Sequence, residues 1–182
     1  MPSPRQRSRI LSAGTAIVVA LIAAVALAGC SRAAATREAA ADIPDDAFPA
    51  TVTYVHDGDT LYLDNGSTEL TVRLIGIDTP ELDSAQQPDA GECYGGEARD
   101  LLRDFLPEGT AVWAVEDREP EDRYERSLLY VYLGDGTFVN LAMIELGAAE
   151  ALKVGLNDRF WPALQSAEDE AFAAQLGRWG QC

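Results

Sequence analysis

Three extended segments joined by two tight turns constrain the fold of this chain more than any other feature. Apolar and polar residues alternate through residues 51–63 on either side of Asp57-Gly58, and a second turn follows at Asp64-Asn65-Gly66. Beyond it the chain returns with apolar residues on one face. Asp-Gly and Asn-Gly turns between alternating segments are typical of antiparallel hairpins. Residues 51–74 are therefore predicted to form a three-stranded meander.

Helix and strand patterns alternate through the rest of the chain. Apolar residues recur with helical spacing through 98–105, and Pro107 and Gly109 end the pattern. Further segments are expected as strands at 111–115 and 128–133 and as helices at about 139–146 and 160–176. Five strands with a helix after the third predict an α+β fold, a five-stranded OB-type Greek-key β-barrel with three helices. An open α+β sandwich is the alternative, because strand count alone does not establish closure.

The N-terminus has the pattern of a bacterial export signal. Arg5, Arg7 and Arg9 precede the apolar stretch 16–28, and the sequence then reads Leu27-Ala28-Gly29-Cys30. This ending resembles the lipoprotein box, in which the cysteine is acylated and becomes the first residue of the mature chain. The apolar run is shorter than the ~20 residues of a membrane-spanning helix. This disfavours the alternative, an uncleaved anchor helix.

These features divide the chain into three parts. We expect residues 1–29 to be a lipoprotein signal peptide, 30–49 a flexible tether rich in alanine and aspartate, and 50–182 a single folded domain. The protein would then be an exported lipoprotein, held on the extracytoplasmic face of a membrane through Cys30.

The cysteine count then points to one disulfide bond. Acylation of Cys30 leaves Cys93 and Cys182 in an oxidising setting, where we expect them to pair. Two free thiols are the alternative. A zinc site is disfavoured because His56 is the single histidine of the chain and cannot complete a zinc shell with two cysteines.

The charge balance is strongly acidic. Removing the predicted signal sequence takes away three arginines, so the remaining chain has a formal charge of −19. Such a charge opposes tight nucleic-acid binding, which depends on cationic contacts to phosphate. Charges beyond ~8 Å are largely screened at physiological salt. A local arginine cluster and a bound cation therefore still permit weak, cation-dependent binding.

Two consecutive predicted strands bring acids and an arginine together. Asp57-Gly58-Asp59-Thr60 lies on one, and Arg73 followed by Asp78-Thr79-Pro80-Glu81 lies on the next. Carboxylates and a guanidinium in one place can hold a hard cation beside a phosphate and deprotonate a water. Downstream, Asp122-Arg123-Tyr124-Glu125-Arg126 adds a further fixed guanidinium, which suits a phosphoryl group that accumulates charge.

These three motifs, in this order, resemble those of the staphylococcal nuclease (thermonuclease) family over about residues 51–179. The resemblance implies a five-stranded OB barrel with three helices and calcium-dependent hydrolysis of DNA and RNA. By position it makes Asp59 and Asp78 direct calcium ligands, with the backbone carbonyl of Thr79 as a third. Calcium prefers six to eight oxygens, so two or three protein ligands leave the ion open, as catalysis requires.

The resemblance also assigns the remaining roles. Glu81 orients or deprotonates the attacking water, while Arg73 and Arg126 hold the phosphate and stabilise the transition state. Arg123 and Tyr124 are expected to bind substrate. A carboxylate beside a cation keeps a low pKa, so much of the rate must come from the ion and the guanidinium groups. The structural alternatives are turn chemistry for the first acidic motif, surface ion pairs for the arginines and a solvated loop acid for Glu81.

The chain departs from the family pattern at three places. Glu125 replaces the usual glycine before Arg126, the loop 82–91 carries acids instead of bases, and residues 151–156 include no aromatic side chain. Stacking, which elsewhere contributes ~1–3 kcal/mol per base, must then be reduced or supplied by Tyr124. We expect a working nuclease with a high Michaelis constant and little base preference.

Two hypotheses of different classes follow. The leading one is an exported, lipid-anchored, calcium-dependent endonuclease, monomeric, that acts on single-stranded or flexible DNA or RNA; manganese and magnesium are alternatives to calcium. The rival is a non-catalytic OB-fold calcium-binding surface lipoprotein that engages a protein partner through its acidic face. The charge of −19 and Glu125 are the features that motivate the rival.

Overall fold

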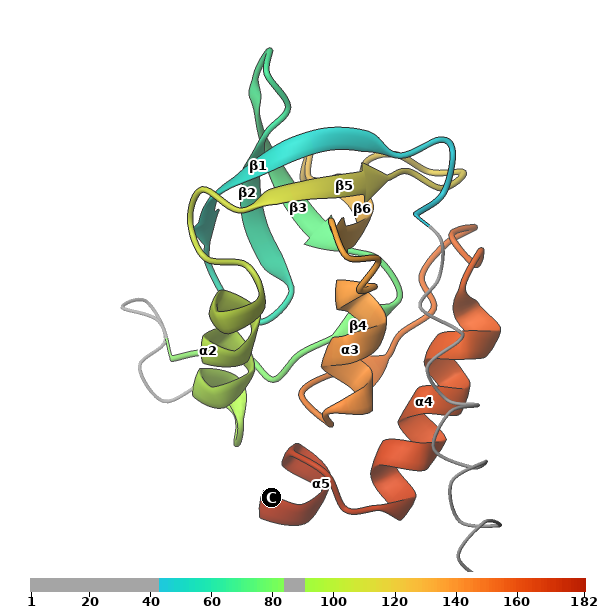
Figure 1. The fold of residues 1–182 in the computed structure, drawn as a ribbon. Coiled ribbons are helices and arrows are strands. Elements are labelled where there is room, and N and C mark those ends of the chain that lie inside the picture. Colours follow the sequence, from blue (N-terminus) through green and yellow to red (C-terminus); the bar gives the residue numbers. More distant parts are fainter. Residues whose placement is uncertain (1–42, 84–90) are drawn as a thin grey trace, which may run out of the picture. The chain divides into compact units, whose positions relative to one another are not determined.

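A closed five-stranded β-barrel dominates the structure, a computed structural model that describes residues 43–83 and 91–182. Its strands are β1 (Phe48–Val55), β2 (Thr60–Asp64), β3 (Glu69–Leu74), β5 (Ala111–Val115) and β6 (Ser127–Leu133). Their order is β1-β2-β3-β6-β5, and β5 pairs with β1 to close the barrel (Figure 1). β3 and β6 pair in parallel, whereas the other neighbours are antiparallel. The predicted OB-type α+β barrel is confirmed, and the open sandwich is excluded.

The barrel begins slightly earlier than the predicted domain boundary at residue 50. β1 starts at Phe48, which pairs with β5, and Ile43 and Ala47 pack on the core. The predicted signal peptide, Cys30 and the larger part of the predicted tether lie outside the described residues, as does most of the acidic loop 82–91.

The meander forms as the alternation predicts, and acidic and amide side chains hold its turns. The Asp57 carboxylate accepts hydrogen bonds from the amides of Asp59 and Thr60, at 3.1 and 2.7 Å. Asp64 and Asn65 accept from backbone amides of the second turn in the same way. Such local bonds satisfy backbone donors where the strand ladder stops. The first turn thereby fixes Asp59 immediately before β2.

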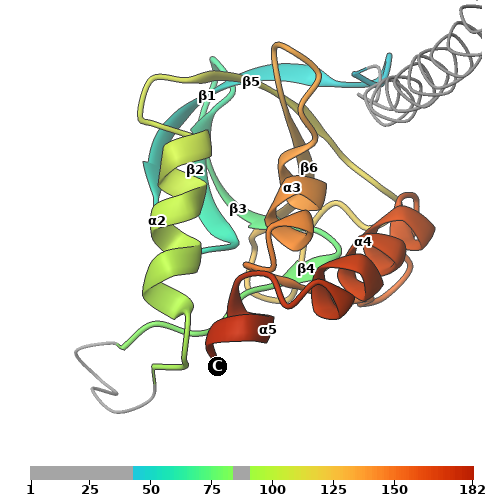
Figure 2. The same cartoon turned by 60° about the horizontal axis from the view of Figure 1, so that its bottom comes forward.

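In the described part of the chain, the three predicted helices lie beside the barrel. They are α2 (Gly95–Phe105), α3 (Val139–Glu145) and α4 (Trp161–Ala173), followed by the short helix α5 (Arg178–Gln181). α3 lies between α2 and α4 in both views (Figures 1 and 2). One hydrophobic core joins the barrel to these helices and includes Leu61, Val72, Leu129, Met143 and Leu164. Among the residues that the structure describes, no helix is both long and apolar enough to span a bilayer.

Two short strands escaped prediction. β4 (Ile77–Asp78) and β7 (Glu150–Ala151) pair antiparallel, with Asp78 opposite Glu150. Strands of two residues are too short to show an alternating pattern. Their pairing attaches the segment that carries the predicted ligands to the chain between α3 and α4.

A buried asparagine and a glycine shape the turn between β3 and β4. Asn140 of α3 is fully buried and donates from Nδ2 to the carbonyl of Ile75 at 2.9 Å. Gly76 has a φ of 79°, and a Cβ there would overlap a leucine of α4. A glycine is the residue that adopts this conformation without strain. The turn brings β4 back beside the end of β3, and so Asp78 beside Arg73.

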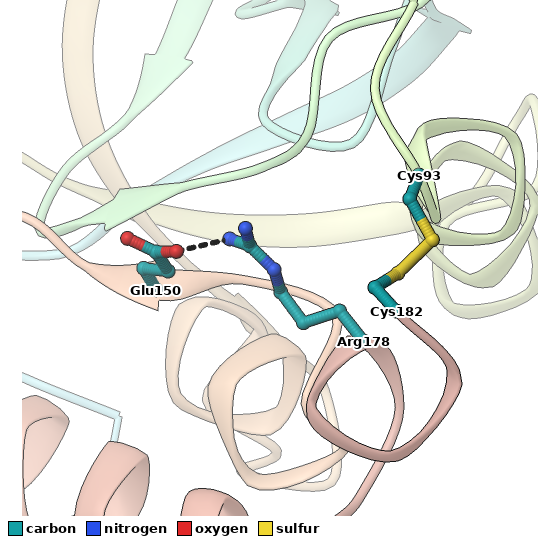
Figure 3. The surroundings of a disulfide bond; sticks show 4 residues. All are labelled: Cys93, Glu150, Arg178 and Cys182. Atoms are coloured by element: carbon teal, nitrogen blue, oxygen red, sulfur yellow. Dashed lines mark ion pairs between the residues drawn. A yellow bond between two sulfur atoms is a disulfide. The ribbon is translucent and has the colours of Figure 1, made fainter.

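A disulfide bond joins Cys93, just before α2, to Cys182 at the end of the chain (Figure 3). The bond spans 89 residues in sequence. Cross-linking a loop of this length lowers the entropy of the unfolded chain and stabilises the fold by ~4–5 kcal/mol in the chain-entropy model.

Candidate active site

Asp59 is the buried carboxylate at the centre of the candidate site, with 7% of the residue exposed. Its Oδ2 accepts hydrogen bonds from the amide and the hydroxyl of Thr79, both at 3.0 Å, and its Oδ1 accepts one from the hydroxyl of Thr60 at 3.1 Å. Gly58 makes this approach possible, because a Cβ there would lie 2.7 Å from Thr79 Oγ1. These contacts fasten the start of β2 to the segment that follows β4.

Arg73 of β3 bridges the two carboxylates predicted as ligands. Its Nη2 lies 3.1 Å from Asp59 Oδ2 and 2.7 Å from Asp78 Oδ1. Its Nη1 donates to the backbone carbonyls of Leu74 and Ile77 at 2.9 and 2.8 Å. The Arg73 side chain is 14% exposed, against 53% for Asp78. The structure therefore gathers Asp59, Arg73 and Asp78 into one cluster, with Asp78 on its solvent side.

The environment of Asp59 favours an additional cation. Burial raises the pKa of Asp59 to about 6, and the charge of Arg73 and the hydrogen bonds from Thr79 oppose this rise without cancelling it. Desolvation disfavours the charged form of a carboxyl group, whereas a nearby positive charge favours it. One guanidinium is therefore not enough to bring the pKa of Asp59 back to its ordinary value.

The oxygen atoms near this cluster fit a hard divalent cation. Asp59 and Asp78 supply carboxylates. Thr79 follows Asp78 in the chain and is hydrogen-bonded to Asp59, and its backbone carbonyl is a further oxygen donor. Oxygen ligands of this kind suit calcium or magnesium. Within residues 43–83 and 91–182, no group of three or more His, Cys, Asp or Glu is arranged to hold a metal ion. The donor set thus fits an open site with few protein ligands rather than a closed structural site.

Glu81 lies on the same segment but at a different hollow. It is exposed, and it lines a depression of about 390 Å³ together with Glu92 and Cys93. Its carbonyl accepts a hydrogen bond from the amide of Glu92 at 2.8 Å, and its amide donates to Glu92 Oε2 at 3.2 Å. The backbone of Glu81 is therefore fixed on both sides, three residues beyond Asp78.

Asp122 organises the downstream motif. Its Oδ1 accepts from the amides of Tyr124 and Arg126 at 2.9 and 3.0 Å, and its Oδ2 accepts from Arg126 Nε at 2.8 Å. Burial alone raises the pKa of Asp122, but the hydrogen bonds from Arg126 and Tyr124 outweigh it, so the pKa lies below its ordinary value. Glu125 has a φ of 62°, in the left-handed region that favours glycine. The loop is thus wrapped around one carboxylate.

A cleft of about 630 Å³ lies between this loop and the turn that follows β3. Arg73, Arg123, Tyr124 and Arg126 all line it, so the structure brings both predicted phosphate-binding arginines and both predicted substrate residues to one cavity. Tyr124 is 63% exposed, and the guanidinium carbons of Arg123 and Arg126 lie 4.6 and 5.5 Å from its ring centroid. An exposed ring beside two guanidinium groups can stack on a base while the arginines hold phosphate.

Comparisons with known proteins agree with this geometry. Residues 71–181 match a family model described as staphylococcal nuclease homologue. A thermonuclease of Staphylococcus intermedius is 38% identical over 125 residues, which are 69% of this chain and 72% of that protein. The chain belongs to the staphylococcal nuclease family. Another relative is a thermonuclease of Staphylococcus hyicus, 32% identical over 69% of this chain and 72% of its own. A protein of Escherichia coli O157:H7 described as an uncharacterized endonuclease is 32% identical over 70% of this chain and 74% of its own.

This member of the staphylococcal nuclease family has an aliphatic wall on one side of its cleft. Leu152 and Val154 line the cavity and are 39% and 66% exposed, and Gly155 lies beside them. The prediction that residues 151–156 offer no aromatic ring to a substrate follows from the sequence alone. The structure adds that this segment does form a wall of the cleft.

Sequence reasoning missed the contacts that tie the two walls of the cleft together. The Glu119 amide donates to Asn157 Oδ1 at 2.8 Å, and Asn157 Nδ2 donates to the Glu119 carbonyl at 2.8 Å. Asn157 is 3% exposed. Its partner is 38 residues away, so no local pattern could reveal the pair. The role of Asp122 was also missed, because its contact with Arg126 lies in a loop, where a spacing of four residues predicts no pairing.

Proposed function

We propose that this chain is a calcium-dependent nuclease that hydrolyses phosphodiester bonds of DNA, RNA or both outside the cytoplasm. The observation that carries the proposal is the Asp59–Arg73–Asp78 cluster, whose arginine also lines the cleft that contains Arg126 and Tyr124. Membership of the staphylococcal nuclease family supports it, as do relatives described as thermonucleases and as an endonuclease.

The arginines bind and stabilise the reacting phosphate. Arg73 and Arg126 both line the cleft, and their planar guanidinium groups stay protonated at any physiological pH. A diester seated between them receives charge-assisted hydrogen bonds on its non-bridging oxygens. These bonds strengthen as negative charge accumulates on the phosphorane, so they lower the barrier more than they stabilise the bound substrate.

Glu81 is the residue proposed to accept the proton of the attacking water. The water oxygen forms a bond to phosphorus in line with the leaving ester oxygen, and the Glu81 carboxylate takes the proton of the water. The bond from phosphorus to the leaving oxygen breaks, and solvent protonates the alkoxide that departs. In the structure the exposed Glu81 side chain lines the neighbouring hollow, so the proposed role requires it to turn toward Asp78, three residues before it. A carboxylate of low pKa is a weak base at neutral pH, so this step contributes less than the electrostatic terms.

Asp59, Asp78 and the carbonyl of Thr79 are the groups proposed to hold calcium. When bound, the ion supplies positive charge beside the phosphate and favours deprotonation of a nearby water. The raised pKa of Asp59 supports the assignment, because a buried carboxylate of this kind is stabilised in its charged form by a second cation.

The cleft suggests the form of the substrate. Tyr124 offers an exposed aromatic ring to the cavity, whereas Leu152 and Val154, which also line it, offer aliphatic contact only. Base stacking elsewhere contributes ~1–3 kcal/mol per base. We therefore infer a flexible or single-stranded substrate, a high Michaelis constant and little base preference.

Export and lipid anchoring are proposed from the N-terminal pattern. Arg5, Arg7 and Arg9 precede an apolar run that ends at Cys30. The disulfide between Cys93 and Cys182 supports this location, because such bonds persist in oxidising compartments and are rare in the cytosol. The proposed protein is a monomer held on the extracytoplasmic face of a membrane.

The deciding experiment is digestion of plasmid and single-stranded DNA and of RNA over a calcium series, with a chelator arm and parallel series of manganese and magnesium. Hydrolysis that rises with calcium and stops on chelation is the expected result. Arg126→Ala should abolish most of it, whereas Arg159→Ala, which removes an exposed ion pair with Asp46, should not change it. Cleavage that ignores the chelator, or no cleavage at any calcium concentration, would refute the proposal.

The non-catalytic alternative has one specific observation in its favour. Glu125 places a negative charge beside Arg126, and the chain without its signal sequence has a formal charge of −19. Both features oppose a polyanionic substrate. Calorimetry that detects calcium binding by a protein with no hydrolytic activity would select a calcium-binding surface lipoprotein that engages a protein partner.

A further inference from the structure

The C-terminal segment docks on the turn that precedes β7. The amide of Arg178 donates to the carbonyl of Gly147 at 2.9 Å. Gly147 and Gly177 have φ values of 69° and 51°, and a Cβ on either would overlap backbone of the other turn. Glycine is what permits two backbones to approach this closely. The contact places α5 against the chain that leads into Glu150.

The first residue of α5 reaches the strand opposite Asp78. Arg178 Nη1 lies 2.5 Å from Glu150 Oε1, and the pair is drawn in Figure 3. Glu150 is the cross-strand partner of Asp78 in the β4–β7 pair. Directly opposed side chains lie on the same face about 5 Å apart at Cβ, and like charges there repel. Arg178 neutralises Glu150 on one side, as Arg73 neutralises Asp78 on the other.

The residue that follows α5, Cys182, reaches the segment that holds Glu81. Cys182 is bonded to Cys93, which directly follows Glu92 in the chain. Glu92 holds the backbone of Glu81 through two hydrogen bonds: its amide donates to the Glu81 carbonyl at 2.8 Å, and its Oε2 accepts from the Glu81 amide at 3.2 Å. The backbone of Gly95 also packs against Glu81, since a Cβ on Gly95 would overlap the Glu81 carbonyl. The disulfide therefore ends one residue away from the group that holds the backbone of Glu81.

We propose that α5 is a staple that positions both ends of the segment Asp78–Glu81, with Arg178 and the Cys93–Cys182 disulfide as positioning residues. The inference rests on the proposed function, which gives Asp78 and Glu81 their roles. Neither Arg178 nor either cysteine lines the 630 Å³ cleft, so they act through other residues and not on substrate. The staple places the cation ligand and the proton acceptor at a fixed separation.

The two attachments differ in strength. The ion pair is partly exposed, at 23% for Arg178 and 42% for Glu150, and exposed pairs contribute little. The disulfide is covalent and closes a long loop. Its loss should therefore lower kcat the more, by about tenfold, since small displacements of catalytic groups cost one to two orders of magnitude. Loss of the ion pair should lower kcat by about threefold.

The first test uses the full chain with Cys93→Ser and Cys182→Ser together, which preserves side-chain size and leaves no free thiol of the pair. The measurements are kcat and KM on single-stranded DNA at saturating calcium, below the unfolding transition, and hydrogen exchange of the backbone amides. We expect kcat to fall about tenfold with KM within about twofold, and exchange to rise at residues 78–83 and 91–95 but not in β1, β2 or β5.

The second test separates charge from shape. Arg178→Ala should lower kcat about threefold, Arg178→Lys should retain most of it, and the double variant Arg178→Ala/Glu150→Gln should restore it, because the uncompensated charge opposite Asp78 is gone. Arg159→Ala is the matched control, since it removes the ion pair between Arg159 and Asp46, which lies outside the segment Asp78–Glu81.

Two results overturn the staple. One is unchanged hydrogen exchange at residues 78–83 in the double serine variant; the other is an unchanged kcat in that variant while the wild type hydrolyses DNA. If the wild type shows no hydrolysis, the proposed function fails, and exchange at 78–83 alone still decides whether α5 orders the segment.

Discussion

The two arginines of the cleft are held in opposite ways. Arg73 is 14% exposed and contacts two carboxylates and two backbone carbonyls from three segments of the barrel and its turns. Arg126 is 30% exposed and is held by Asp122, four residues earlier on the same loop. The Arg73 guanidinium thus joins separate segments of the fold, whereas the Arg126 guanidinium contacts only a residue of its own loop among the ion pairs described. Changes at Arg73 should affect stability and hydrolysis together, and changes at Arg126 should affect hydrolysis alone.

The largest expected effect belongs to Arg73→Ala. Removing this guanidinium leaves Asp59 buried without its ion-pair partner and Asp78 without its closest cation. We expect the free energy of unfolding to fall by about 3 kcal/mol, as for broken buried pairs, and hydrolysis to fall by at least about a thousandfold. Urea unfolding and single-stranded DNA digestion measure the two. Arg73→Lys keeps the charge but not the fork and should recover stability more than activity. An unaltered urea midpoint for Arg73→Ala would show that Arg73 does not stabilise the fold more than Arg126 does.

Arg126→Ala is expected to separate the two quantities. The loop keeps the amide hydrogen bonds to Asp122, so the free energy of unfolding should change by less than about 1 kcal/mol, as for exposed ion pairs. Hydrolysis should fall by about a hundredfold or more, because a charge-stabilising donor is lost. Arg123→Ala is the control on the same loop and should raise KM with a smaller loss of kcat. A destabilisation equal to that of Arg73→Ala would show that Arg126 too belongs to the fold.

The pH dependence of stability tests how Arg73 is held, through its buried partner Asp59. Its folded pKa of about 6 exceeds the ordinary value of 3.8, so the folded protein binds this proton more tightly than the unfolded chain. The contribution of Asp59 to stability is therefore fully present below about pH 4 and is lost as pH rises through about 6, by up to about 3 kcal/mol without a divalent cation. Denaturant unfolding at pH 4, 5, 6 and 7 measures it. The stability of wild type relative to Asp59→Asn should fall over this range, and calcium should reduce the fall; a difference that stays constant or rises with pH contradicts the assignment.

Asp122→Asn tests the loop arginine through its partner, with the opposite sign. The folded pKa of Asp122 lies below 3.8, so its contribution to stability is present above that value and is lost as pH falls below it. The variant should be less stable than wild type at pH 7 and equally stable near pH 2. Hydrolysis should fall about tenfold, because Arg126 loses the carboxylate that orients it. Asp135→Asn, at an exposed turn away from the cleft, should leave hydrolysis unchanged.

Local patterns in the sequence predicted most of the fold and the composition of the site, but not how the site is held. Alternation and turn residues are local, so the meander and the strand 111–115 could be read directly. Asp59, Arg73 and Asp78 were predicted as a cluster because consecutive strands must meet. The Asn140 and Asn157 bonds and the pairing of β4 with β7 join residues far apart in sequence. Such contacts leave no periodic signal, because only the closed fold brings the partners together.

The smallest expected effect is a gain, at the residue that departs most clearly from the family pattern. Glu125 adopts a φ of 62° and lies beside Arg126, so it carries both backbone strain and a charge that repels substrate. Glu125→Gly should raise the free energy of unfolding by about 0.5–1 kcal/mol, because a left-handed conformation strains other residues by about that amount or more, and should lower KM by about threefold at low salt. Glu125→Gln removes the charge and keeps the strain, so it should lower KM without stabilising the protein. If both variants leave KM unchanged across a sodium chloride series, the charge of Glu125 does not weaken the binding of phosphate by Arg126.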